Sequence, residues 1–192
     1  MKRLALIFSI VLFLNNCGYN EIQALDEEVS ANWAEVLNQY KRRADLVPNL
    51  VNTVKAFAAQ EKDVLQGIAD ARSKLGSLQA TPELLQNPEA FDRFNQAQNQ
   101  LGGALSRLLM VQENYPQLKS DARFGDLMAQ LEGTENRITV ARNRFIQATK
   151  NYNTYVRQFP AVITAKLFGY GSKATFTVED SKKIENAPQV EF

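Results

Sequence analysis

The most regular pattern in this 192-residue chain lies between residues 120 and 159, where apolar or small side chains recur at alternating steps of three and four. These side chains are Phe124, Leu127, Leu131, Thr134, Ile138, Ala141, Phe145, Ala148, Tyr152, Tyr155 and Phe159. The spacing is typical of a helix that packs at a shallow angle against other helices. We expect Ser120 to cap it and Pro160 to end it, at a length of roughly 57 Å. A helix of this length needs other helices and the chain ends to cover it.

Two amphipathic patterns at the start of the chain predict helices over about 20–43 and 46–76. We expect them to meet near Pro48, because proline cannot donate a backbone hydrogen bond and disfavours helical geometry at Val47. Asp45 is placed to cap the second of these helices. The chain is therefore expected to fold back on itself at residues 43–48.

A further pattern predicts a helix over about 88–115, with Asn87 as its cap and Pro116 at its end. Gly76 is expected to stop the preceding helix. We therefore predict an all-α fold, an up-and-down antiparallel four-helix bundle over residues 17–160. The tail 161–192 has no sustained period, but it is too apolar for a free linker and is expected to dock on the bundle, with an exposed partner surface as the alternative.

Composition excludes several classes of function. There are 22 Lys and Arg against 21 Asp and Glu, so the net charge of +1 gives no field that would attract nucleic acid. The chain has no histidine, which removes serine–histidine and cysteine–histidine catalysis. Its single cysteine, Cys17, cannot form an internal disulfide.

The N-terminus has the layout of a secretory signal peptide over residues 1–16. Two basic residues precede a mostly apolar run at 4–14. Crossing a bilayer takes about 20 apolar residues, and this run supplies about half that number, so a spanning anchor is the weaker interpretation.

Cys17 follows the apolar run directly, as in a bacterial lipoprotein signal, and Leu14 and Gly18 agree with that resemblance. The asparagines at 15 and 16 depart from the small residues usual there, and an uncleaved anchor with an incidental thiol is the alternative. Lipidation of Cys17 would fix the protein to a membrane of the cell envelope, facing the periplasm or the exterior. Gly18 in place of an acid favours the outer membrane, but the choice of membrane stays open.

Three adjacent cations, Lys41, Arg42 and Arg43, fall in the last turn of the first predicted helix. There they face the negative end of the helix dipole, and a contact with lipid headgroups is the alternative.

The candidate polar residues of the last long helix are Glu132, Glu135, Asn136 and Arg137. The two glutamates are spaced to share a helix face, which makes a metal site with Glu35 or Asp45 worth testing. Di-iron sites in bundles also need histidine, so we expect no metal and no cofactor.

Exposed ion pairs are the simplest interpretation of these charges, each worth at most about 1 kcal/mol. Alternatively, Glu135, Asn136 and Arg137 form a buried polar contact with Asp45 or Asn49 that fixes the alignment of the helices.

Several motifs, in order along the chain, resemble those of the LemA family. They are YKRRADLVPNLV at 40–51, YPQLK at 115–119, LEGTENRI at 131–138, YN at 152–153, FP at 159–160 and PQVEF at 188–192, while CGYN at 17–20 resembles the start of lipoprotein members. The resemblance implies an up-and-down four-helix bundle held at a bacterial envelope membrane, with no established activity. Family relatives on magnetosome membranes suggest a structural role, and neighbouring genes suggest envelope proteases or TPM-domain proteins as partners.

Two classes of function remain. The first is a noncatalytic, membrane-tethered scaffold or adaptor that binds another envelope protein or itself. The second is an envelope enzyme or metal-binding protein that uses carboxylates and arginine, for which Glu135, Asp45 and Arg42 would have to converge in a polar pocket.

Overall fold

The protein is all-α. The computed structural model describes residues 18–78 and 80–176, and within these ranges it contains helices and no strand, which confirms the expected class. The α-helices are α2 (Tyr19–Phe57), α3 (Lys62–Gly76), α4 (Pro88–Gln112), α5 (Pro116–Lys119), α6 (Ala122–Tyr155) and α7 (Ala161–Phe168), and η1 (Pro82–Gln86) is a 3₁₀ turn. The predicted signal peptide, Cys17 and the closing PQVEF motif lie outside the described residues.

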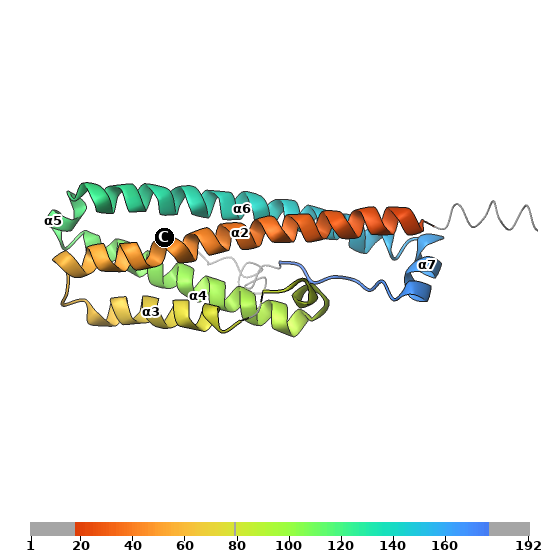
Figure 1. Cartoon of the computed structure of the whole chain (residues 1–192), viewed down its shortest axis with the longest axis horizontal. Helices are drawn as coiled ribbons and strands as arrows, with labels where there is room; N and C mark the ends of the chain where they lie inside the picture. Colours follow the sequence, from red (N-terminus) through yellow and green to blue (C-terminus); the bar gives the residue numbers. More distant parts are fainter. Residues whose placement is uncertain (1–17, 79, 177–192) are drawn as a thin grey trace, which may run out of the picture.

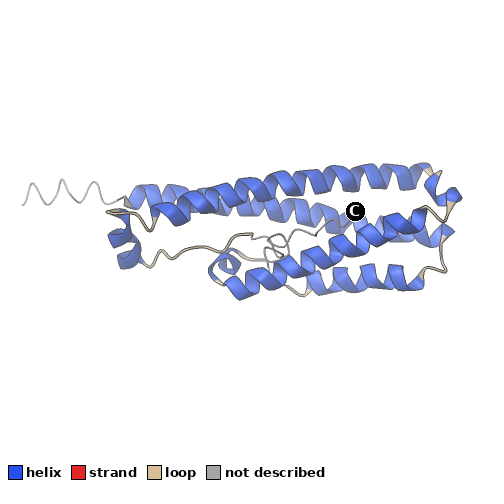
Figure 2. Ribbon diagram, turned by 180° about the vertical axis from the view of Figure 1, so that it is seen from behind, coloured by secondary structure: helices blue, strands red, loops and turns tan. Residues whose placement is uncertain are grey.

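The long helices α2 and α6 lie side by side along the molecule, and the shorter α3 and α4 pair with each other (Figure 1). At 1.5 Å per residue, the 39 residues of α2 span about 58 Å and the 34 residues of α6 about 51 Å. Seen from behind, α2 and α6 extend past α3 and α4 at one end (Figure 2). The described ranges therefore form an elongated body with α5 at one end and α7 at the other.

The predicted break near Pro48 is wrong, because α2 runs without interruption from Tyr19 to Phe57 with Pro48 inside it. An interior proline costs roughly 3 kcal/mol through a lost hydrogen bond and a steric clash. Val47, Leu50 and Val54 on the same helix are fully buried, and their packing outweighs that cost. The chain turns at residues 58–61 instead, and Asp45 is an exposed side chain within α2 and caps nothing.

The other helix ends agree in part with the sequence. α3 ends at Gly76, and the Asn87 side chain accepts a hydrogen bond from the backbone N–H of Ala90, so both predicted signals are confirmed. Helix α4 ends at Gln112, before Pro116, which begins α5 instead. The N-cap of α6 is Asp121 rather than Ser120, since the Asp121 carboxylate accepts from the N–H of Phe124 at 2.8 Å.

Ser120 has a different role from the predicted one. Its hydroxyl donates to the carbonyl oxygens of Pro116 and Gln117, so it closes α5. Helix α6 ends at Tyr155, four residues before the expected end at Phe159.

The core is divided into two clusters along the axis. One contains the first half of α2, the second half of α6, the start of α4, η1 and α7, with Trp33, Phe91 and Phe145 at its centre. The other contains the second half of α2 together with α3, α5, the end of α4 and the start of α6. Each cluster is closed by different short elements.

Part of the C-terminal tail completes the first cluster. Phe176 is 7% exposed and packs on Phe91 and Phe145 at ring-centroid distances of 5.0 and 5.6 Å. Asn153 holds the approaching chain through two hydrogen bonds with the backbone of Lys173, and the Lys173 ammonium pairs with Asp26 of α2 at 2.6 Å. The tail is therefore docked at 173–176, between α2 and α6.

Candidate functional site

A buried arginine lies where the two apolar clusters meet. Arg43 is 4% exposed and occupies α2 between Tyr40, in one cluster, and Val47, in the other. Gln98 holds the matching place on α4, between Phe94 and Leu101, and Glu135 lies on α6 between Leu131 and Ile138. We call Arg43, Gln98 and Glu135 the polar layer. It joins the middle of three helices.

Hydrogen bonds hold the Arg43 guanidinium on two sides. One terminal nitrogen donates to both carboxylate oxygens of Glu135, at 3.0 and 3.2 Å. The other donates to the backbone oxygen of Gln98 at 3.1 Å and to its side-chain oxygen at 2.5 Å. Gln98 is itself buried, whereas the Glu135 side chain is 43% exposed. The cation is therefore neutralised by a carboxylate that still contacts solvent, which lowers the cost of burying it.

Tyr40 forms one wall of the polar layer. The Arg43 guanidinium carbon lies 5.2 Å from the centre of its ring, within the range of a cation–π contact. Burial raises the pKa of the Tyr40 phenol, and the positive charges of Arg142 and Arg43 oppose that shift. The phenol is therefore neutral at physiological pH, and it borders the layer without adding charge.

The structure separates the residues of the predicted polar motif. Arg42, Asp45 and Asn49 are exposed on α2 and Pro48 is half-buried, so none of them joins Glu135. On α6, Glu132, Asn136 and Arg137 are also exposed, and Arg137 donates to the Thr134 hydroxyl of its own helix at 3.4 Å. A polar contact between helices exists, but it joins Glu135 to Arg43. The prediction that Asp45 or Asn49 is the partner of Glu135 is wrong.

Gln98 is the residue that the predicted site omits. The signal for it was a polar residue at an apolar position, since Gln98 continues the spacing set by Phe91, Phe94 and Leu101. Arg43 gives the same signal in α2, three residues after Tyr40 and four before Val47.

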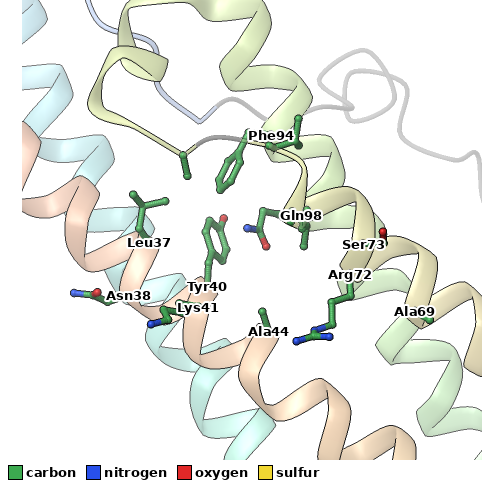
Figure 3. A pocket seen from close by; sticks show the side chains of 14 residues that line it. Leu37, Asn38, Tyr40, Lys41, Ala44, Ala69, Arg72, Ser73, Phe94 and Gln98 are labelled. Carbon is green, nitrogen blue, oxygen red and sulfur yellow. The ribbon is translucent and has the colours of Figure 1, made fainter.

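A groove of about 800 Å³ opens beside the polar layer, between α2, α3 and the start of α4 (Figure 3). Tyr40, Phe94 and Gln98 form its buried wall. The exposed cations Lys41 and Arg72 stand on opposite sides of it, on α2 and α3. The groove is thus mostly apolar inside, with Gln98 as a polar group in its wall and positive charge at its edges.

The carboxylates of the described residues do not gather into a metal site. Within 18–78 and 80–176, no group of three or more Asp, Glu or Cys side chains is close enough to hold an ion. Glu35, one predicted partner of Glu132 and Glu135, is exposed and accepts a hydrogen bond from Gln39 of its own helix. Glu132 and Glu135 line a second groove of about 690 Å³, on the α4–α6 side.

Two of the motifs that carry the family resemblance, at 40–51 and 131–138, supply Arg43 and Glu135 of the polar layer, and the sequence profile of the LemA family matches residues 32–192. The chain belongs to the LemA family. Among curated proteins it is similar to magnetosome protein MamQ of Magnetospirillum gryphiswaldense, at 25% identity over 85% of this chain and 67% of the relative. MamQ 1 and MamQ 2 of Paramagnetospirillum magneticum match with the same identity and coverage.

The structure gives physical roles to two motifs of this LemA protein. Arg43 of the YKRRADLVPNLV motif is the centre of the polar layer, and Asn153 of the YN motif anchors the tail. Tyr152, beside Asn153, is buried, and burial together with the nearby Asp26 raises its pKa to about 12. None of the described helices is both long enough and apolar enough to cross a bilayer.

Proposed function

We propose that this LemA protein is a noncatalytic scaffold or adaptor of the bacterial cell envelope, built as a four-helix bundle and tethered by lipid on Cys17. Family membership and the similarity to magnetosome proteins support a role at a membrane. The position of Gly18 also supports it, because the chain enters α2 at one end of the elongated body (Figure 1). A tether there would leave the long sides of the helices open to partners.

The observation that carries the noncatalytic proposal is the ion pair between Arg43 and Glu135. An enzyme built on Glu135, Asp45 and Arg42 would need the three to converge in a polar pocket. Instead Glu135 is engaged by the buried Arg43, while Arg42 and Asp45 are exposed on α2. The charged groups nearest the core therefore bind each other, and this arrangement supports a structural role.

The groove beside Tyr40 is the part of the surface best suited to a partner. A protein segment with an apolar side chain and a nearby carboxylate would fit against the wall formed by Tyr40 and Phe94 while pairing with Lys41 or Arg72. An envelope protein such as a protease or a TPM-domain protein, or a second copy of the chain, is the proposed source of that segment.

Photo-crosslinking in cells tests this proposal. A photoreactive residue is placed at Lys41 or Arg72, at the groove, and at the exposed Lys150 of α6 as the matched control. We expect a defined envelope protein to be captured from the two groove positions, but not from Lys150, and the capture to be lost in Cys17→Ser. Equal capture at all three positions, or capture that persists without membrane attachment, would contradict the adaptor proposal.

A further inference from the structure

Helix α7 has its small side chains inside and its large apolar side chains outside. Ala161, Thr164 and Ala165 are buried against the body, whereas Ile163 is 60% exposed and Leu167 is 77% exposed. A helix that faces only water shows the opposite arrangement, with its bulky apolar residues turned to the core. Something other than water is therefore expected on the outer face of α7.

The exposed apolar surface extends to both ends of α7. Phe159, just before the helix, is 82% exposed, and Phe168 at its end is 58% exposed. The Phe168 ring lies 5.1 Å from that of Tyr19, the first residue of α2. We call Phe159, Ile163, Leu167 and Phe168 the α7 patch. Exposed apolar patches of this kind mark protein or membrane contacts.

The α7 patch lies where the N-terminal segment joins the body. Gly18 has a φ of 66°, and a Cβ atom there would lie 2.6 Å from the Tyr155 hydroxyl and 3.4 Å from the Cβ of Ala161. The chain leading back to Cys17 and the apolar run 4–14 thus begins against the first residue of α7. Whether lipid on Cys17 or that run itself enters the bilayer, the α7 patch is held next to it.

The charges of α7 and of the turns on either side of it suit an anionic lipid surface, whereas the exposed acids at this end, Glu21, Glu27 and Glu28, belong to α2. Between residues 156 and 176 the sequence has the cations Arg157, Lys166 and Lys173 and no acid. Lys173 pairs with Asp26, while Arg157 is exposed just before the patch and Lys166 is exposed within it, beside Leu167. Apolar side chains flanked by cations and aromatic rings are the usual composition of helices that lie in the headgroup region of a membrane.

We propose that α7 lies in the headgroup region of an anionic membrane, with Ile163 and Leu167 turned to the acyl chains. The inference rests on the proposed tether, which brings α7 to the surface. The α7 patch adds a second membrane contact beside the tether. With both contacts at one end, the long axis of the body would stand upright on the membrane with α5 pointing away from it. The occupant of the patch is thus a lipid surface rather than a second protein.

Fluorescence quenching in membranes tests the placement of α7. Single cysteines replace Ile163 or Leu167 in the full chain, and Val140→Cys serves as control, because Val140 is an aliphatic residue of α6 with a similar exposure of 50%. Each variant is labelled with an environment-sensitive fluorophore in membranes, and labelling of the parent chain at Cys17 is subtracted. We expect probes at 163 and 167 to shift to shorter wavelength and to be quenched by a spin-labelled lipid. The probe at 140 should respond only to aqueous iodide.

The other outcomes separate the inference from the tether. If the protein is in the membrane fraction and all three probes respond equally to iodide, the α7 inference is wrong and the tether stands. Probes at 163 and 167 shielded from both quenchers would reveal a protein contact and also overturn the lipid assignment. A chain absent from the membrane fraction would overturn the tether, and with it the inference.

Discussion

The polar layer makes a strong prediction about stability, because Arg43 and Arg42 are adjacent in sequence and opposite in environment. Replacing Arg43 by alanine removes two buried methylenes, worth about 0.8 kcal/mol each. It also leaves the buried Gln98 side chain without its 2.5 Å partner, at about 1–3 kcal/mol. The Glu135 carboxylate is hydrated on its exposed side, so the loss of its Arg43 partner adds little to the loss of stability. The expected loss is about 4 kcal/mol.

For a chain of this size, 1 kcal/mol corresponds to about 2–4 °C in melting temperature, so Arg43→Ala should melt roughly 8–16 °C lower than the parent. Arg42→Ala, at an exposed position on the same helix, should shift the free energy of unfolding by less than about 0.5 kcal/mol. Calorimetry and denaturant unfolding monitored by circular dichroism measure both variants.

Glu135 tests the pairing itself. Its side chain is 43% exposed, so solvent screens the ion pair and Glu135→Ala should cost only about 1–2 kcal/mol. The matched control is Glu132→Ala, one turn earlier and exposed. In a double-mutant cycle of Arg43→Met with Glu135→Gln, we expect a coupling energy near 1 kcal/mol. A coupling within about 0.3 kcal/mol of zero, or equal losses for Arg43→Ala and Arg42→Ala, would refute the reasoning.

Three further predictions concern the ends of the helices and the tail. Asn87→Ala should cost about 1 kcal/mol in unfolding free energy, and Thr81→Ala less, because of these two caps Asn87 makes a side-chain cap hydrogen bond and Thr81 does not. Phe176→Ala should cost about 3–5 kcal/mol and change the emission of Trp33, the only tryptophan, whose ring lies 6.2 Å from that of Phe176; an unchanged spectrum would mean that the tail is not docked. The pKa of Tyr152, raised to about 12, gives stability that is present below pH 10 and lost as pH rises to 12, so Tyr152→Phe should flatten the fall in unfolding free energy over that window.

The helical class and most of the core followed from apolar spacing alone. Phe124, Leu131, Ile138 and Phe145 are buried in α6 as the seam predicts, because a stripe repeating every three or four residues can face only one side of a helix. The ends of α6 were placed less well. Ser120 and Asp121 are both good caps, and which of them caps depends on how α5 closes, which the spacing does not report.

The wrong break at Pro48 and the unrecognised burial of Arg43 concern the same apolar series in α2. The positions Trp33, Val36, Tyr40, Arg43, Val47, Leu50 and Val54 follow alternating steps of three and four without a gap. The break was predicted from the missing N–H of Pro48 and its effect on Val47, without counting Arg43 as a member of that series. With Arg43 counted as buried, the same spacing predicts one continuous helix through Pro48, as observed in α2.

The burial of Arg43 could not be read from its type, since arginine is rarely buried without a partner. Its acceptors, Gln98 and Glu135, are 55 and 92 residues away in sequence. Only the packing of α2 against α4 and α6 brings them together. Long-range pairs of this kind are not visible to rules based on spacing within one helix.

The polar layer also explains how helices with such uniform seams keep one alignment. Sliding α6 along α2 by one turn would still bring apolar residues against apolar residues, so the two clusters alone discriminate weakly between alignments. The same shift would move Glu135 about 5.4 Å from Arg43, and the guanidinium would be left among apolar side chains with one set of its hydrogen bonds unmade. The observed alignment is thus the one that gives both terminal nitrogens of Arg43 their acceptors, and it also puts α7, Gly18 and the docked tail in the same half of the molecule.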